Sequence, residues 1–362
     1  MTPKILQDLL NFKAKDIKIG DKAIGYNQPL YFIAEAGVNH NGDIKLALKL
    51  IEEAKKCGAD AIKFQTFKAE QVCLPNSPTP EYQKKNTGAD NQWKLLRPLE
   101  LEEKYYPILI KKAKQLKIDF LSTPHGHIDS VKFLKKIGIP AFKVGSGDIT
   151  NLPLLSFLAK QDKPILLSTG TADLKEIKEA IEVIDKQKGK VIILHCNTNY
   201  PTPDKEANVS AILDLYRNFP DKLVGYSDHT VKTESLIAAA ALGAVIIEAH
   251  FTLDKKLPGP DHKASFNPLE LKNAIKMIRQ TEKIIGDGYK KPTAGELKMA
   301  PMVRKSITTT KKIKKREKFT EKNLSIRRPE KGGIKPKFWN KIMGKKAVKN
   351  FSADIQLKKE DY

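Results

Sequence analysis

The sequence lacks the segments that would send a protein into or across a membrane. No stretch approaches the roughly 20 consecutive apolar residues that span a bilayer. The N-terminal MTPKILQDLLNFKAKDIKIG has neither the apolar core nor the small-residue cleavage site of a signal peptide. The 3 cysteines, Cys57, Cys73 and Cys196, are too scattered for a zinc knuckle and odd in number for a disulfide framework. These absences predict a cytoplasmic protein with no membrane partner.

Positive charge is in excess, but the aromatic residues that usually accompany nucleic-acid binding are missing around it. Lysine and arginine total 65 against 42 acidic residues, which gives a net charge of +23. The densest cluster, KKIKKR at 311–316, contains no side chain on which a base could stack. We therefore expect a solvated basic surface and no nucleic-acid partner, and the charge still permits an anionic small substrate.

Apolar stretches of strand length alternate with amphipathic helical segments over residues 1–286. The strands are short, β-branched and apolar on both faces, as buried parallel strands are. Eight such units favour an α/β fold of the closed (β/α)8 TIM-barrel type. An open doubly wound sheet is the alternative, but its glycine fingerprint is missing. The expected strands are 31–38, 61–67, 119–124, 141–147, 164–170, 191–196, 223–228 and 245–251.

The composition changes near residue 286. We expect residues 1–286 to form the barrel, with an N-terminal hairpin at IKIGDKAIGY that closes its floor. Residues 287–304, punctuated by proline and glycine, are typical of a linker. Residues 305–362 predict a small β-rich domain that is too short to bury much core alone.

Polar residues stand at the end of every predicted strand, where a barrel of this type carries its active face. Lys63 and Lys143 lie within strands and are costly to bury without an opposite charge. A salt bridge to Glu35 or Glu248 would satisfy either lysine alone. The pair together with nearby hydroxyls favours a bound phosphate or carboxylate. These hydroxyls belong to Ser122, Thr123, Ser146, Ser168 and Ser227.

Histidine is scarce, with 7 residues, yet two fall at the ends of neighbouring strands. His229 ends VGYSDHT and His250 lies in EAHF. Strands lie about 5 Å apart, so two imidazoles at that spacing can hold one metal ion. With oxygen ligands they suit Mn²⁺ or Mg²⁺. Two unrelated core histidines are the alternative.

The remaining histidines and cysteines are less informative. His195 and Cys196 are adjacent on a strand and so point to opposite faces, which disfavours a catalytic dyad and predicts that Cys196 is buried in the packing. Of the loop histidines, only His40 and His262 lie in segments rich in polar groups.

A series of distinctive segments runs in order along the chain: IAEAGVNHNGD, AIKFQTFKAE, FLSTP, KVGSGDITNLPLL, LSTG, GYSDHT, EAHFTLDKKLPGPDHKAS and RKSI. With these segments the chain resembles, over essentially its whole length, the sialic acid synthases. Its tail resembles the small antifreeze-like (SAF) domain that follows the barrel in that family.

The resemblance implies that phosphoenolpyruvate condenses with an N-acetylated amino-sugar aldehyde, releasing phosphate. His229 and His250 would carry a divalent metal, Mn²⁺ foremost, with Mg²⁺ or Co²⁺ as alternatives. Glu35 would activate or position the water that adds to the enolpyruvate. The implied phosphoenolpyruvate ligands are Lys63, Ser122 or Thr123, Lys143, Ser146, Ser168, Thr198, Tyr200 and Ser227.

The resemblance also implies how the sugar is held. Gln65, Asp148 and Asp261 would bind its hydroxyls. Arg328 of the partner subunit would contact the N-acetyl group, which implies a domain-swapped homodimer. Ala249 stands where the family usually has lysine, on the strand face away from the metal.

Three functions remain open at this point. The first is a synthase that uses N-acetylmannosamine or 2,4-diacetamido-2,4,6-trideoxy-mannose, giving N-acetylneuraminate or N,N'-diacetyllegionaminate. The string EYQKKNTG (81–88), which lies where a loop would cover the substrate, slightly favours the latter. The second is another phosphoenolpyruvate-dependent 3-deoxy-sugar-acid or pseudaminate synthase. The third is a non-catalytic basic protein that binds glycans or nucleic acid.

Overall fold

The chain folds into two compact units, residues 1–288 and 289–362, each with a hydrophobic core of its own. The structure, a computed structural model, describes residues 2–125 and 127–362. Within this described part, none of the helices combines the length and apolar character that crossing a lipid bilayer requires.

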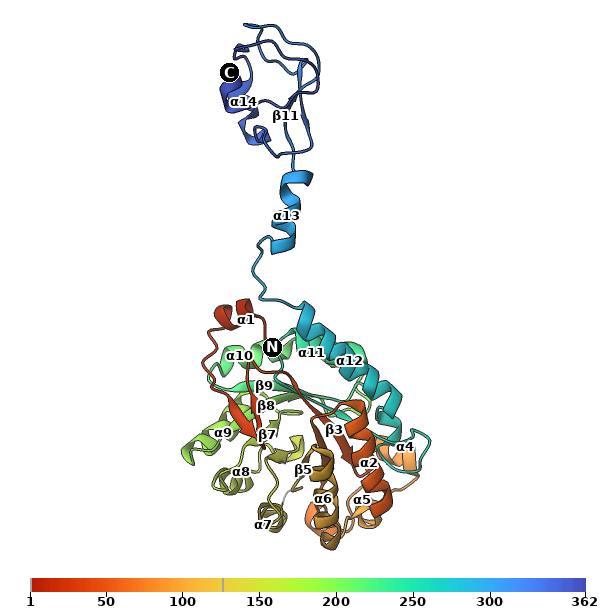
Figure 1. Cartoon of the computed structure of the whole chain (residues 1–362). Helices are drawn as coiled ribbons and strands as arrows, with labels where there is room; N and C mark the ends of the chain where they lie inside the picture. The colour runs from red at the N-terminus through yellow and green to blue at the C-terminus, as the bar shows by residue number, and fades with distance from the viewer. Residues whose placement is uncertain (1, 126) are drawn as a thin grey trace. The chain divides into compact units, whose positions relative to one another are not determined.

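A closed barrel of eight parallel strands forms the centre of the larger unit (Figure 1). The strands follow one another in chain order and the last pairs with the first, which confirms the TIM barrel and excludes the open sheet. Their residues are almost all buried because side chains fill the inside and helices cover the outside. The strands are β3 (Tyr31–Gly37), β4 (Ala61–Gln65), β5 (Asp119–Thr123), β6 (Phe142–Val144), β7 (Ile165–Ser168), β8 (Val191–Cys196), β9 (Leu223–Asp228) and β10 (Ile246–His250).

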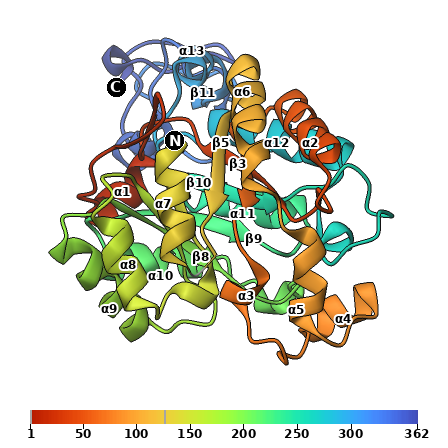
Figure 2. The ribbon, with the colours of Figure 1, turned by 90° about the horizontal axis from the view of Figure 1, so that it is seen from below.

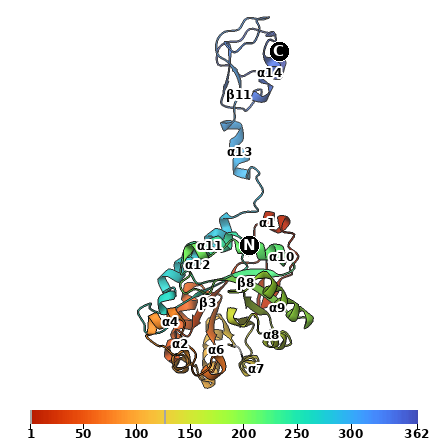
Figure 3. The same ribbon diagram turned by 180° about the vertical axis from the view of Figure 1, so that it is seen from behind.

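Helices follow the strands and surround them (Figures 1 and 3). Two of them begin with a capping box, Asp173 with Glu176 and Asn267 with Glu270, which satisfies backbone N–H groups that the helix itself leaves unpaired. The helices are α2 (Ile44–Cys57), α6 (Tyr106–Leu116), α7 (Ile128–Lys136), α8 (Leu152–Ala159), α9 (Leu174–Lys186), α10 (Ala211–Asn218), α11 (Thr233–Ala241) and α12 (Pro268–Ile284).

The N-terminal segment covers the amino ends of the strands. After α1 (Lys4–Leu9), β1 (Ile17–Ile19) and β2 (Lys22–Ile24) pair as the expected hairpin. Lys22 binds the carboxylate of Asp60 at 2.8 Å, just before β4 begins. The hairpin therefore closes the barrel floor and leaves the carboxyl ends of the strands open.

A helical insertion between β4 and α6 lies apart from the ring of helices. It contains α3 (Ala69–Val72), α4 (Glu81–Thr87) and α5 (Gln92–Leu96), which lie together in Figure 2. A separate apolar cluster holds it in place. The buried members of that cluster are Val38, Phe67, Ala69, Leu96 and Leu99.

The smaller unit begins with a helix that the sequence did not lead us to expect. The predicted linker includes a helix, α13 (Ala294–Val303), whose first turn is fixed by a capping box of Thr293 and Glu296. Beyond it, β11 (Ser306–Thr309) pairs antiparallel with β12 (Leu324–Arg327), and α14 (Trp339–Ile342) follows. The core of this unit comprises Ile307, Ile313, Phe319, Leu324, Ile334, Ile342, Ala347, Phe351 and Leu357.

Candidate active site

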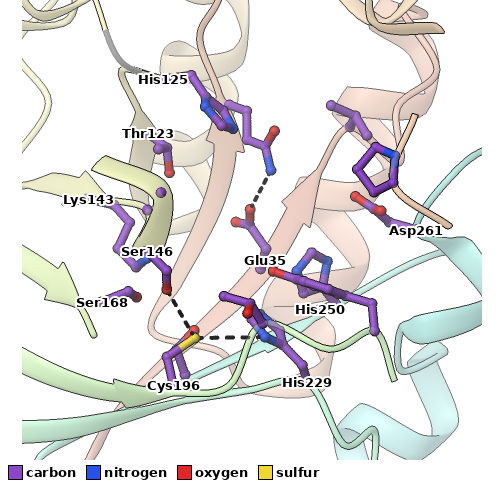
Figure 4. Close-up of a pocket in the computed structure, with 18 of the residues that line it drawn as sticks. Glu35, Thr123, His125, Lys143, Ser146, Ser168, Cys196, His229, His250 and Asp261 are labelled. Carbon is purple, nitrogen blue, oxygen red and sulfur yellow. Dashed lines mark hydrogen bonds between the residues drawn. The ribbon is translucent and has the colours of Figure 1, made fainter. Parts of the chain in front are cut away.

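A cavity of about 240 Å³ lies at the carboxyl ends of the barrel strands (Figure 4). We name two parts of its lining, the strand side and the helical wall. The strand side consists of Glu35, Lys63, Gln65, Thr123, Lys143, Ser168, Cys196, Ser227, Glu248 and His250. The helical wall consists of Val38, Phe67, Val72, Pro80, Tyr82, Gln83, Gln92 and Leu96.

Four buried charges face one another on the strand side. Lys63 Nζ lies 2.8 Å from Glu35 Oε2 and 3.7 Å from Glu248 Oε1, and it donates to Thr123 Oγ1 at 3.0 Å. Burial alone would lower the pKa of Lys63, but Glu248 and Glu35 raise it above its ordinary value. Burial raises the pKa of Glu35 to about 7 despite the opposing effect of Lys63. A carboxyl group poised near neutral pH suits proton transfer.

Lys143 is the less well paired of the two lysines. Its Nζ lies 3.7 Å from Glu248 Oε1 and donates to its own strand at Val144 O, 3.2 Å away. Burial lowers the pKa of Lys143, and the attraction of Glu248 offsets only part of this effect. An anion bound beside Lys143 would supply the missing opposite charge.

Hydroxyl groups surround these lysines. Ser168 Oγ is buried and has no hydrogen-bond partner in the described chain. Ser227 Oγ donates to Glu248 Oε1 at 3.2 Å, and Ser146 Oγ accepts from the Gly170 backbone N–H at 3.0 Å. Thr198 and Tyr200 line the same cavity. An unpaired buried hydroxyl beside ammonium groups matches an anion that needs further donors.

The two histidines meet as their strand positions predict. The ring centroids of His229 and His250 are 5.3 Å apart, and the ring of Tyr200 covers His229 at 4.0 Å. Asp228, which points away from the cavity, fixes the turn after β9 by accepting hydrogen bonds. Its donors are the Tyr226, Thr230 and Ser235 hydroxyls and the Val231 backbone N–H.

The residues present fit a metal held by two nitrogen atoms. Burial keeps the pKa of His250 well below its ordinary value, and its Nδ1 has no partner in the described chain. His229 Nδ1 contacts the Asn197 carbonyl, which leaves Nε2 available. Burial lowers the pKa of His229, but Cys196 and Asn197 raise it above its ordinary value. Among the described residues no group of three or more acidic, histidine or cysteine ligands forms, so water and substrate would complete the ion's coordination.

A third group of polar atoms surrounds Gly37. Gln65 Nε2 donates to Glu35 Oε1 at 3.4 Å. A Cβ atom on Gly37, whose φ is +52°, would stand 3.3 Å from Glu35 Oε1 and 3.8 Å from Asp261 Oδ2. Only glycine leaves these side chains this close to the backbone. Burial raises the pKa of Asp261 to about 6, and its Oδ1 has no partner in the described chain.

Comparison with known protein families shows the family to which this chain belongs. The model of the NeuB family matches residues 50–290, and the SAF domain model matches residues 304–362. The chain belongs to the NeuB family. The predicted resemblance to sialic acid synthases is thereby confirmed, tail included.

Relatives of this NeuB chain cover nearly all of it. The N,N'-diacetyllegionaminic acid synthase of Campylobacter jejuni is 48% identical over 89% of this chain and 97% of its own length. The enzyme of the same name from Legionella pneumophila is 40% identical over 93% and 96%. The crystal structure of a sialic acid synthetase from Leptospira borgpetersenii, in complex with citrate, superposes with a TM-score of 0.71 at 36% identity, over 79% of this chain and 95% of that one.

The structure of this NeuB chain brings together most of the predicted site residues, whose roles stay predictions. Two predicted positions of the larger unit do not line the cavity. Ser122 points to the other face of β5 and bonds to Thr66 Oγ1 at 2.7 Å, because strand residues alternate and Thr123 takes the inner position. Asp148 ends a short 3₁₀ turn and accepts from Asn151 Nδ2 at 3.3 Å, at the start of α8. Arg328 is exposed in the smaller unit, just after β12.

Strand alternation between His195 and Cys196 holds, but with a result we did not predict. His195 faces away from the cavity and contacts Ala207 O through Nε2 at 3.0 Å. Cys196 therefore faces inward, lining the cavity rather than packing the core, 3.6 Å from Ser146 Oγ. Burial would raise the pKa of Cys196, but His229 and Lys143 hold it below its ordinary value.

Other cavity residues were missed because they lie outside the predicted strands. His125, directly after FLSTP, lines the cavity, and so do Tyr82 and Gln83 in the string EYQKKNTG. His40 and His262, which the sequence favoured, lie outside it. His40 Nδ1 accepts from the Gly42 backbone N–H at 3.0 Å, and His262 Nδ1 contacts Thr252 Oγ1 at 2.6 Å. Both hold loops in place.

Proposed function

We propose that this enzyme condenses phosphoenolpyruvate with 2,4-diacetamido-2,4,6-trideoxy-mannose to give N,N'-diacetyllegionaminate and phosphate. Family membership supports a nonulosonic acid synthase. The similarity to two N,N'-diacetyllegionaminic acid synthases, at 48% and 40% identity, supports this acceptor over N-acetylmannosamine. The free thiols Cys57, Cys73 and Cys196 suit our placement of the enzyme in the cytoplasm.

The observation that carries the proposal is the set of polar groups around Lys143, which suits a bound anion. A buried, weakly paired ammonium group lies on the same side of the cavity as the unpartnered hydroxyl of Ser168. We propose that Lys63, Lys143, Thr123 and Ser146 hold the phosphate and carboxylate of phosphoenolpyruvate. Further ligands in this proposal are Ser168, Thr198, Tyr200 and Ser227.

The reaction needs one carbon–carbon bond, one water and one leaving group. C3 of phosphoenolpyruvate bonds to the aldehyde carbon, water adds to C2, and phosphate leaves by C–O cleavage. Glu35 positions that water and takes its proton, since its raised pKa places it near neutral pH. Bound at His229 and His250, a divalent metal (Mn²⁺, with Mg²⁺ or Co²⁺ as alternatives) supplies Lewis-acid polarisation of the aldehyde oxygen.

The acceptor sugar lies, in this proposal, between Gln65 and Asp261, whose carboxylate has an unpaired oxygen. We further propose a domain-swapped homodimer in which Arg328 of the partner subunit contacts an N-acetyl group. The support is that Arg328 is exposed on the SAF domain, and a guanidinium group offers several N–H donors to an acetyl oxygen.

The test is phosphate release from phosphoenolpyruvate with Mn²⁺ and one sugar at a time. We expect release with 2,4-diacetamido-2,4,6-trideoxy-mannose, together with a nine-carbon 2-keto acid of the mass of N,N'-diacetyllegionaminate. Release that occurs only with N-acetylmannosamine would move the assignment to N-acetylneuraminate. Absence of release with every acetamido sugar would refute the proposed reaction.

A further inference from the structure

The helical wall carries a buried amide whose oxygen has no partner. Gln83, on α4, lines the cavity with only 8% of its surface exposed. Its Nε2 donates to the Tyr82 hydroxyl at 2.9 Å, while its Oε1 has no hydrogen-bond partner in the described chain. An acceptor oxygen removed from water without a donor is costly, so it marks a place where a ligand can supply an N–H or O–H group.

Gln83 lies at a definite place relative to the histidines. The ring of Tyr82 stacks on Tyr200, with centroids 4.9 Å apart and planes at 19°, and Tyr200 in turn covers His229 at 4.0 Å. Helix α4 is tied to the loop beside Asp261 by Asn86 Nδ2, which donates to Pro260 O at 2.7 Å. These contacts place α4 beside both Tyr200 and the Asp261 loop, so we expect a sugar whose aldehyde lies at the histidines to direct its far carbons towards α4, which carries Gln83.

The composition of the helical wall further limits the kind of group that can bind beside Gln83. Its other members are mostly apolar: Val38, Phe67, Val72, Pro80 and Leu96. Among the cavity-lining residues of the described chain, the only lysine or arginine side chains are Lys63 and Lys143, both on the strand side. The helical wall thus suits an uncharged group that combines a hydrogen-bond donor with methyl groups, and it offers nothing to a phosphorylated sugar end.

We propose that Gln83 determines acceptor specificity by accepting a hydrogen bond from the N–H of the C4 acetamido group, while the apolar residues of the helical wall contact its methyl group and the C6 methyl. This inference rests on the proposed function, because it assigns a residue to the far end of the proposed acceptor. N-acetylmannosamine has hydroxyl groups at C4 and C6, so it would place polar atoms against the apolar residues of the helical wall.

The test is a cycle of two enzymes and two acceptors. Wild type and Gln83→Met, which keeps the length but removes the amide, are each assayed with the diacetamido sugar and with 2-acetamido-2,4,6-trideoxy-mannose, which lacks the C4 group. We expect Gln83→Met to lower kcat/KM for the diacetamido sugar about tenfold or more and to leave the C4-deoxy acceptor within about twofold. The KM for phosphoenolpyruvate stays unchanged, and exposed Lys85→Met on the same helix behaves as wild type.

Equal loss with both acceptors, or a parallel rise in the KM for phosphoenolpyruvate, would mean that Gln83 only supports α4 and would overturn the inference. So would no loss with either acceptor. If Gln83→Met is insoluble, Gln83→Ala enters the same cycle. Failure of the wild type to use the diacetamido sugar would instead refute the proposed function, so the two failures are distinguishable.

Discussion

The strand side of the cavity and its helical wall differ in how they are built and in what they carry. The strand side contains two lysines and two carboxylates, all buried, on the strands of a closed barrel. The helical wall is almost uncharged, lies on short helices, and depends on its own small apolar cluster. Rigid strands suit a reaction that needs charges at fixed positions. The residues of an insertion can differ between enzymes with different acceptors without disturbing those charges.

The largest effect should come from removing charge on the strand side. Lys143→Met should lower kcat/KM for phosphoenolpyruvate by about 10³-fold, because it removes a cation aimed at the substrate anion. The melting temperature should also fall, since Lys143 is the leading cation that stabilises the buried carboxylate of Glu248. Steady-state phosphate release and thermal melting measure both, with exposed Lys160→Met as control. Near-normal turnover in Lys143→Met would show that this lysine does not hold the anion.

Loss of either histidine should be the next largest effect. His229→Ala and His250→Ala should each lose at least about 10²-fold in Mn²⁺-dependent activity while remaining folded. Chelation should inactivate wild type, and added Mn²⁺ should restore it but not the variants. His127→Asn, at a histidine that caps α7, is the matched control. Full activity in either alanine variant would remove that histidine from the metal site.

A smaller effect should separate binding of the acceptor sugar from binding of phosphoenolpyruvate. Arg328→Ala should raise the KM for the sugar about tenfold, which corresponds to one charged hydrogen bond, and leave the KM for phosphoenolpyruvate nearly unchanged. The neighbouring Arg327, which pairs with Asp354, provides a control through Arg327→Ala. Equal increases in the two KM values would contradict the domain-swapped arrangement.

The smallest effect concerns the support of the helical wall at low pH. Burial lowers the pKa of His40 to about 4, and protonation of Nδ1 would break its bond from Gly42, next to Pro98. The unfolded chain binds this proton near pH 6.5 and the folded chain does not, so stability falls as pH drops from 6.5 towards 4, by about 2 kcal/mol at pH 5. Urea unfolding of wild type and His40→Asn at pH 7 and 5 measures this. An equal pH dependence in the two proteins would exclude His40 as its source.

The sequence predicted the strand side better than the helical wall. Alternation along a strand placed Lys63 with Gln65 and His229 with Ser227, because a period of two residues needs no tertiary information. For Ser122 and Thr123 alternation allows only one inward side chain, and the sequence did not settle that it is Thr123. The place of Asp148 depends on how the chain leaves β6, which periodicity does not give. The string EYQKKNTG was expected to cover the substrate as a loop, but Tyr82 and Gln83 were not singled out, since a helical insertion is placed by distant packing rather than by periodicity.

One competition experiment tests the division between the two sides of the cavity most directly. The enzyme is given limiting phosphoenolpyruvate with equal concentrations of 2,4-diacetamido-2,4,6-trideoxy-mannose and N-acetylmannosamine. The amounts of the two products are then measured by mass spectrometry. We predict an excess of N,N'-diacetyllegionaminate of about tenfold or more, set by the helical wall. Equal amounts, or an excess of N-acetylneuraminate, would contradict this account.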